Sequence, residues 1–196
     1  MDLLDIFKLP ICESLKGRLS SAVFAIHSIR KNVDSKTALL SYFAYFHSLL
    51  SYGIVYWGFS SSAFSIFLLQ KRALRAIYGL RRDVSCRDLF HQNKVLTLYG
   101  QLAMDTCHLI HSLRHLLKKH SDVHTYSTRN REKLVPSTEA KFRKSYLNAG
   151  IKIYNSLPTS IKILNDRQFK PALKQTLLKI SPYSIEELQQ TLSQLV

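Results

Sequence analysis

Cationic side chains concentrate in one short segment near the middle of the chain. Six of them lie within 17 residues, and the same span contains one acid, Asp83. Arginine presents a planar set of donors that matches a phosphate, and each neutralised phosphate releases counterions, so this segment suits the backbone of nucleic acid. A solvated helix face is the alternative interpretation, and nothing in the pattern specifies a base sequence. The six residues are Lys71, Arg72, Arg75, Arg81, Arg82 and Arg87.

The excess of positive charge extends over the whole chain. Its 196 residues include 28 Lys and Arg against 13 Asp and Glu, which gives a formal net charge of +15 and a pI of about 9.9. A folded protein with this charge attracts polyanions, either nucleic acid or acidic lipid. We therefore expect a polyanionic partner and no small-molecule substrate.

Three histidines recur on the segment that follows residue 100. His111 and His115 stand four residues apart, a spacing that can chelate a transition metal on a helix. On a helical wheel they share a face with Lys118 and Lys119, whose ammonium groups disfavour a dication. No CxxC motif or carboxylate completes a site. We expect no metal site here, and a solvent-facing polar stripe that also includes His108.

No motif of a catalytic site occurs in the sequence. HExxH, GxSxG and the glycine-rich phosphate loop are all absent. The 13 acids are scattered, with no spacing that predicts metal-dependent or general acid–base chemistry. We expect no catalytic residue, no cofactor and no enzymatic activity from this chain alone.

The basic segment follows a window without Asp, Glu, Lys or Arg that runs from Thr37 to Gln70. Residues 38–57 are long enough to cross a bilayer. Their tyrosines are scattered through the block, however, whereas those of membrane proteins gather at its two interfaces, and Gly53 would weaken a helix. The pattern favours the interior of a helical bundle, and a membrane span ranks last. We expect six aromatic residues to lie mainly in the core: Tyr42, Phe43, Tyr45, Phe46, Tyr56 and Trp57.

The periodicity of α-helices runs through most of the chain and predicts an all-α fold. Asp34 is placed to cap a helix that ends at Gly53, and Gly79 to end the helix of residues 63–78. On a wheel of that last helix, apolar side chains lie about opposite the cations. The other predicted helices cover residues 15–29, 86–91, 97–119, 146–156, 166–179 and 184–195.

The cysteines and the first residues of the chain indicate the cellular compartment of the protein. Cys12, Cys86 and Cys107 are an odd number at wide spacing, and the opening residues lack the pattern of a signal peptide. An intracellular, reduced protein of the nucleus or cytoplasm is the expectation.

Several strings in register now match a known family. FHSLLSYGIVYWG, LQKRALRAIYGL, SCRDLF and NKVLTL are followed by HTYSTRN, GIKIYNSLP, IKIL and FKPALKQTLL. In order and spacing, from about residue 15 to the end, they resemble the region just C-terminal to the reverse transcriptase palm of jockey-like non-LTR retrotransposons.

This resemblance implies a domain plan and a role. Residues 1–80 would be a thumb-like helical bundle, 81–120 connecting helices, 121–137 a loop and 138–196 a smaller helical C-terminal region. A thumb holds an RNA/DNA primer–template duplex or hybrid through its backbone. The family's palm binds two Mg²⁺ ions with paired aspartates, but this sequence contains no FxDD or YxDD string. The resemblance therefore implies a truncated, non-catalytic fragment, with any Mg²⁺ belonging to the missing palm.

The residues expected to contact phosphates follow from the basic segment and the thumb. They are Lys71, Arg72, Arg75, Arg81 and Arg82, with Arg129 and Arg131 of the 121–137 loop as weaker candidates. The alternative function is a helical module that docks on a protein partner through exposed apolar surface.

Overall fold

The computed structural model describes residues 3–123, 131–139 and 145–194. Helices dominate these residues, and the only β pairing within them is an isolated bridge between Lys119 and Leu134, which confirms the all-α prediction. The chain divides into two compact units, the N-unit (Met1–Leu102) and the C-unit (Ala103–Val196). The division falls within helix α7 (Leu98–Leu113).

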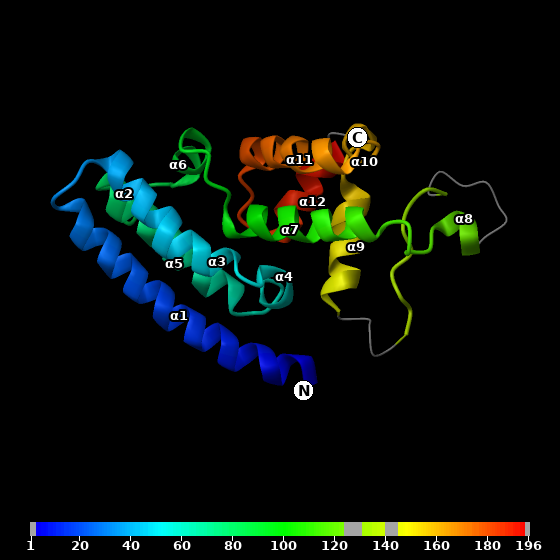
Figure 1. Ribbon diagram of the computed structural model, residues 1–196, viewed down its shortest axis with the longest axis horizontal. Coiled ribbons are helices and arrows are strands. Elements are labelled where there is room, and N and C mark those ends of the chain that lie inside the picture. Colours follow the sequence, from blue (N-terminus) through cyan, green and yellow to red (C-terminus); the bar gives the residue numbers. More distant parts are fainter. Residues whose placement is uncertain (1–2, 124–130, 140–144, 195–196) are drawn as a thin grey trace. The chain divides into compact units, whose positions relative to one another are not determined.

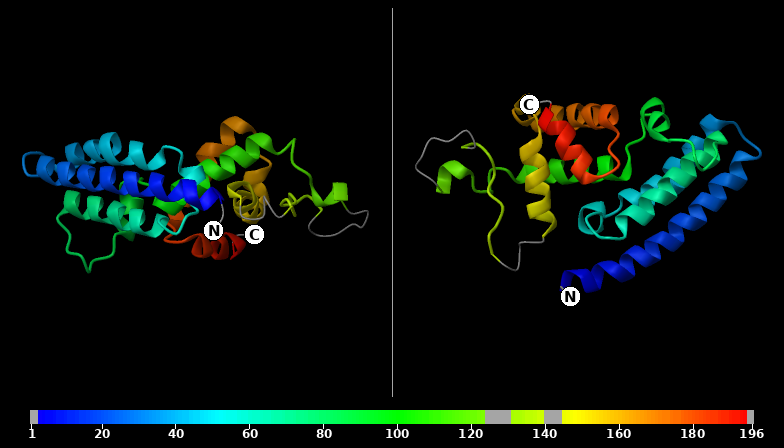
Figure 2. Two further views of the ribbon diagram at one scale, coloured as in Figure 1. Left: turned by 90° about the horizontal axis from the view of Figure 1, so that it is seen from below. Right: turned by 180° about the vertical axis from the view of Figure 1, so that it is seen from behind.

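Two long helices, α1 and α5, lie side by side in the N-unit (Figures 1 and 2). The apolar stripe predicted for residues 15–29 is confirmed, although α1 begins earlier. Arg30, in the last turn of α1, donates from Nε to the carbonyl of Ile77 at 2.7 Å and so joins the C-terminal ends of the two helices. The helices before α7 are α1 (Leu3–Arg30), α2 (Ser35–Ser41), the π-helix η1 (Tyr42–His47), α3 (Ser48–Ser51), α4 (Ile54–Trp57), α5 (Ala63–Tyr78) and α6 (Arg87–Gln92).

The helix boundaries predicted at Asp34, Gly53 and Gly79 are present. Oδ1 of Asp34 accepts a hydrogen bond from the N–H of Thr37 at 2.9 Å at the start of α2. The run of α2, η1 and α3 ends before Gly53, whose φ of 60° lies in the left-handed region. Gly79 has a φ of 66° and ends α5 in the same way.

The charge-free block is only partly buried. Of its six aromatic residues, Tyr42, Phe46 and Trp57 belong to the core as predicted. The other three are exposed: Phe43 by 38%, Tyr45 by 54% and Tyr56 by 62%. This half of the prediction is wrong because α2, η1 and α3 pack against α1 and α5, and such a helix buries only the stripe that faces its neighbours. Within the described residues, no helix combines the length and the apolar character that crossing a membrane requires.

Gln70 is the buried polar anchor of the N-unit. Its Nε2 donates to the Tyr42 hydroxyl and to the carbonyl of Leu96, both at 2.9 Å. Its Oε1 accepts from the N–H of Leu98 at 2.7 Å. One side-chain amide on α5 therefore holds both η1 and the irregular segment that leads into α7.

The C-unit packs the second part of α7 against helices near the C-terminus. Where α9 meets α7, Gly150 allows close approach, because a Cβ there would lie 2.4 Å from Cγ2 of Thr106. Ser145 and Asn165 cap α9 and α11 by accepting main-chain hydrogen bonds from residues three positions further on. The other helices are α8 (His120–Val123), α9 (Tyr146–Ser156), α10 (Thr159–Lys162), α11 (Asp166–Ile180) and α12 (Ile185–Gln194).

Helix α7 ends at Leu113, so the prediction of a helix over residues 97–119 is wrong at its C-terminal end. The guanidinium of Arg114 donates to the carbonyl of His111 and satisfies one of the last acceptors of the helix. The chain then pairs with the segment that precedes α9: His120 N–H donates to Lys133 at 3.0 Å, and Val135 N–H to Lys118 at 2.9 Å.

Two asparagines of α9 bind the segment of residues 134–137. Asn155 accepts from the N–H of Leu134 at 3.0 Å and donates to its carbonyl at 2.8 Å. Asn148 makes the same pair with Ser137, at 2.9 and 2.8 Å. Seven residues of helix and three of extended chain both span about 10 Å, so the two intervals match. Part of the predicted 121–137 loop is thus fixed along α9.

Replacing Gln70 with Leu should destabilise the N-unit. Three buried partners would lose a hydrogen bond, and we expect the free energy of unfolding to fall by about 2–5 kcal/mol. Urea denaturation followed by the fluorescence of Trp57, the only tryptophan, measures this because the side chain is 3% exposed and lies in the N-unit. The matched control, exposed Gln92→Leu on α6, should change stability by less than about 0.5 kcal/mol. Equal effects of the two changes would contradict the role of Gln70.

Candidate nucleic-acid interface

Five of the predicted phosphate contacts lie on α5 and the turn that follows it. The buried side of α5 is an apolar stripe that includes Gln70, and Arg72 lies on the exposed side of the helix. Lys71 is half-buried, and its Nζ lies 4.8 Å from the centroid of the Phe67 ring. Burial, followed by the nearby charge of Arg75, lowers the pKa of Lys71.

Arg75 is engaged within the protein. Its Nε and Nη2 donate to the carbonyl of Val84 at 3.3 and 2.8 Å, and this holds the turn after Gly79 against the end of α5. Two of the five guanidinium N–H groups make these bonds, so Arg75 retains donors but has a fixed position. Arg75 therefore supports the turn that carries Arg81 and Arg82.

Arg81 and Arg82 are exposed in that turn. Nε of Arg81 lies 3.3 Å from Oδ1 of Asp83, a surface ion pair that contributes little stability and can exchange for a phosphate. The structure thus places Lys71, Arg72 and Arg75 in the C-terminal half of α5, and Arg81 and Arg82 in the turn that follows it. Arg131 is exposed in the C-unit, and Arg129 lies outside the described residues.

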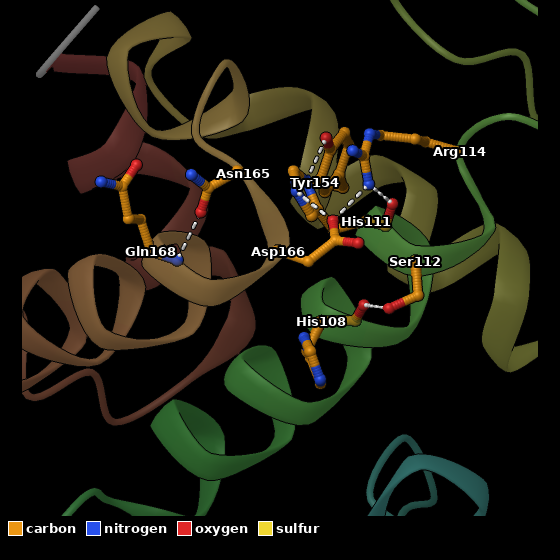
Figure 3. Close-up of polar contacts among 8 residues, drawn as sticks. All are labelled: His108, His111, Ser112, Arg114, Tyr154, Asn165, Asp166 and Gln168. Atoms are coloured by element: carbon orange, nitrogen blue, oxygen red, sulfur yellow. Dashed lines mark hydrogen bonds and ion pairs between the residues drawn. The ribbon is translucent and has the colours of Figure 1, made fainter.

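The prediction of a solvent-facing histidine stripe is wrong for His111, which is fully buried. Its ring lies beside Tyr154 and Asp166 (Figure 3). Its ring stacks on Phe169 with 3.8 Å between centroids and 8° between planes. Its Nδ1 shares a hydrogen bond of 3.0 Å with the Tyr154 hydroxyl. Its Nε2 lies 3.3 Å from Oδ1 of Asp166, which also accepts from Arg114 at 2.8 Å. The ring is buried because α9 and α11 cover the face of α7 that carries it.

These surroundings favour the neutral forms of the His111 imidazole and the Tyr154 phenol. Burial, and then Arg114, lowers the pKa of His111, although Asp166 opposes the shift. Burial raises the pKa of Tyr154 to about 12. The hydrogen bond from Arg114 is the main cause that lowers the pKa of Asp166. A neutral phenol and a neutral imidazole are the states that a packed core accommodates, so we interpret the group as structural.

No metal-binding group emerges from the described part of the chain. His115 is exposed and His108 half-buried, and residues 3–123, 131–139 and 145–194 hold no cluster of three or more His, Cys, Asp or Glu that could bind an ion. The cations at the end of α5 remain the candidate interface.

Comparison of the chain with models of protein families, with curated proteins and with solved structures finds no match in any of the three.

The C-unit should lose stability in mild acid through His111. Its folded-state pKa lies below the ordinary value of 6.5, so the unfolded chain binds more protons between these two values. The stabilisation is present above about pH 6.5 and is lost as the pH falls through the lowered pKa. Amide hydrogen exchange in α9 and α11, corrected for the intrinsic rate, should show weaker protection at pH 5 than at pH 7.

Two variants test the assignment to His111. His111→Phe keeps an aromatic ring against Phe169 but cannot titrate, so its protection should depend less on pH over this interval. Exposed His115→Gln should behave like the unchanged protein. An identical pH dependence in all three proteins would rule out His111 as the cause.

Proposed function

We propose that this chain binds the backbone of an RNA/DNA duplex or hybrid without reading its sequence. In this proposal it corresponds to the thumb and C-terminal region of a jockey-like RNA-directed DNA polymerase, and it performs no catalysis alone. The observation that carries the proposal is the group of cations at the end of α5, on a helix whose opposite face is anchored in the core.

The geometry of this face suits phosphates better than bases. Arg72 and Arg82 are exposed, and the ion-pair partner of Arg81 is the exposed Asp83. Contacts from such side chains to phosphate and sugar fix a protein on a duplex but carry no sequence information. The turn that bears Arg81 and Arg82 is fixed by Arg75, so the cations keep a defined spacing.

A second candidate function is supported by exposed apolar side chains of the N-unit. Phe24 is 73% exposed and Tyr52 85%, and Tyr52 borders a groove of about 710 Å³ formed by α1, α3 and the residues around Trp57. Such surface is typical of a docking site for another protein. Size-exclusion chromatography with light scattering tests self-association through this surface, and a monomer at all concentrations would argue against it.

Binding of an RNA–DNA hybrid should depend steeply on salt. Fluorescence anisotropy should show affinity falling between roughly 50 and 200 mM salt, because bound phosphates release counterions. Changing Arg72 and Arg82 to Glu should weaken binding on the order of tenfold or more at low salt and flatten the salt dependence by about two counterions. The matched control is Lys174→Glu with Lys179→Glu, which makes the same charge change on exposed positions of α11. Absence of salt-sensitive binding, or equal losses in the two double variants, would contradict the proposed face.

The purified chain should not extend a primer. With an RNA template, a DNA primer, Mg²⁺ and nucleotides, we expect no incorporation, since the sequence lacks the paired-aspartate strings that hold the metal ions in the family it resembles. Incorporation that survives repurification of the chain would disprove the non-catalytic assignment.

A further inference from the structure

A groove of about 780 Å³ lies within the C-unit, between the end of α7, the segment before α9, and α10. Its lining is basic. Arg114 and Lys119 come from the chain that follows α7, Lys133 from the segment of residues 131–135, and Lys162 from the end of α10. Among the described residues that line it, Glu132 is the only acid.

Two of the four cations have acidic partners. Nζ of Lys119 lies 2.7 Å from Glu132, and Arg114 bonds Asp166 at 2.8 Å. Lys133 and Lys162 also line the groove, and within the described residues neither forms an ion pair with an acid. Burial lowers the pKa of Lys162, and the charge of Lys133 lowers it further. The two ammonium groups repel each other across the groove, although they come from segments about thirty residues apart. An anion bound between them would offset this repulsion.

Main-chain contacts place Lys133 and Lys162 at the same groove. The isolated bridge between Lys119 and Leu134 fixes one wall. Asn155 holds Leu134 to α9 through two hydrogen bonds, and so places the neighbouring Lys133 beside the groove. Lys162 is positioned by a hydrogen bond of 3.4 Å from its Nζ to the carbonyl of Asn155.

Apolar surface lies beside these charges. Leu134 and Leu157 line the groove, and Ile163 at its edge is 76% exposed. A single strand offers both a phosphate backbone and unstacked base faces, whereas a duplex keeps its base faces inside the stack. The volume is within the range of small-ligand sites, so it would take only a short stretch of strand.

We propose that this groove binds the phosphates of a single-stranded nucleic acid, with Lys133 and Lys162 as the principal contacts. The site lies in a different unit from the face proposed for the duplex, and either proposal can fail alone.

The test uses the full chain and a labelled 12-nucleotide oligouridine RNA, with the RNA–DNA hybrid as a second probe. Lys133→Met with Lys162→Met removes both charges and keeps most of the apolar stems. Lys174→Met with Lys179→Met makes the same charge change on α11 and serves as the control. In anisotropy at low salt, the groove variant should bind the RNA at least fivefold more weakly, and the control should change by less than twofold.

One further measurement distinguishes the groove from the face proposed for the duplex, and another distinguishes lost binding from lost folding. The Arg72→Glu, Arg82→Glu variant should bind the hybrid on the order of tenfold more weakly and keep most of its affinity for the single strand. The groove variant should unfold in urea at the same or a higher concentration than the unchanged chain, because a repulsion is removed. Equal loss of RNA binding in the groove variant and its control, or no binding of the RNA by the unchanged chain, overturns the proposal.

Discussion

Hydrogen bonds from three side-chain amides hold irregular parts of this chain to its helices. Gln70 satisfies the main chain just before and at the start of α7, and Asn148 and Asn155 do the same for the segment before α9. A carboxamide donates and accepts at once, so it replaces both partners that a main-chain peptide would have in a helix or sheet. Without such partners, these segments would have to leave the core, because unpaired buried peptide groups are strongly destabilising.

The same constraint shapes both basic surfaces. In the N-unit, Gln70 fixes the inner face of α5 and therefore the side from which Arg72 projects. The guanidinium of Arg75 donates to the carbonyl of Val84 and so also supports the turn that follows α5. In the C-unit, Asn155 fixes Leu134 and so sets where Lys133 lies. Each cationic surface thus rests on hydrogen bonds made by a neighbouring side chain.

The helices and their caps could be predicted from the sequence because their signals are local. Asp34 stands three residues before the N–H that it caps, and the apolar stripes of α1 and α5 repeat at the helical period. The burial of His111 could not be predicted in this way. On a wheel of the helix predicted over residues 97–119, His111 shares a polar face with Lys118 and Lys119. That His111 is covered follows only from its stacking on Phe169, 58 positions further along the chain. The groove was missed for the same reason, since Lys133 and Lys162 share no spacing that a helical wheel or motif detects.

For the two asparagines of α9, the sequence does contain a pattern that relates them to a distant segment. Asn148 and Asn155 are seven residues apart, two turns on one face of a helix, and Leu134 and Ser137 are three apart in a chain that contains Pro136. Both intervals span about 10 Å, so each asparagine meets a peptide group when the segment runs antiparallel to α9. Either amide alone would allow the segment to pivot. Two amides in register fix its direction as well as its position, and with it the side on which Lys133 lies relative to Lys162.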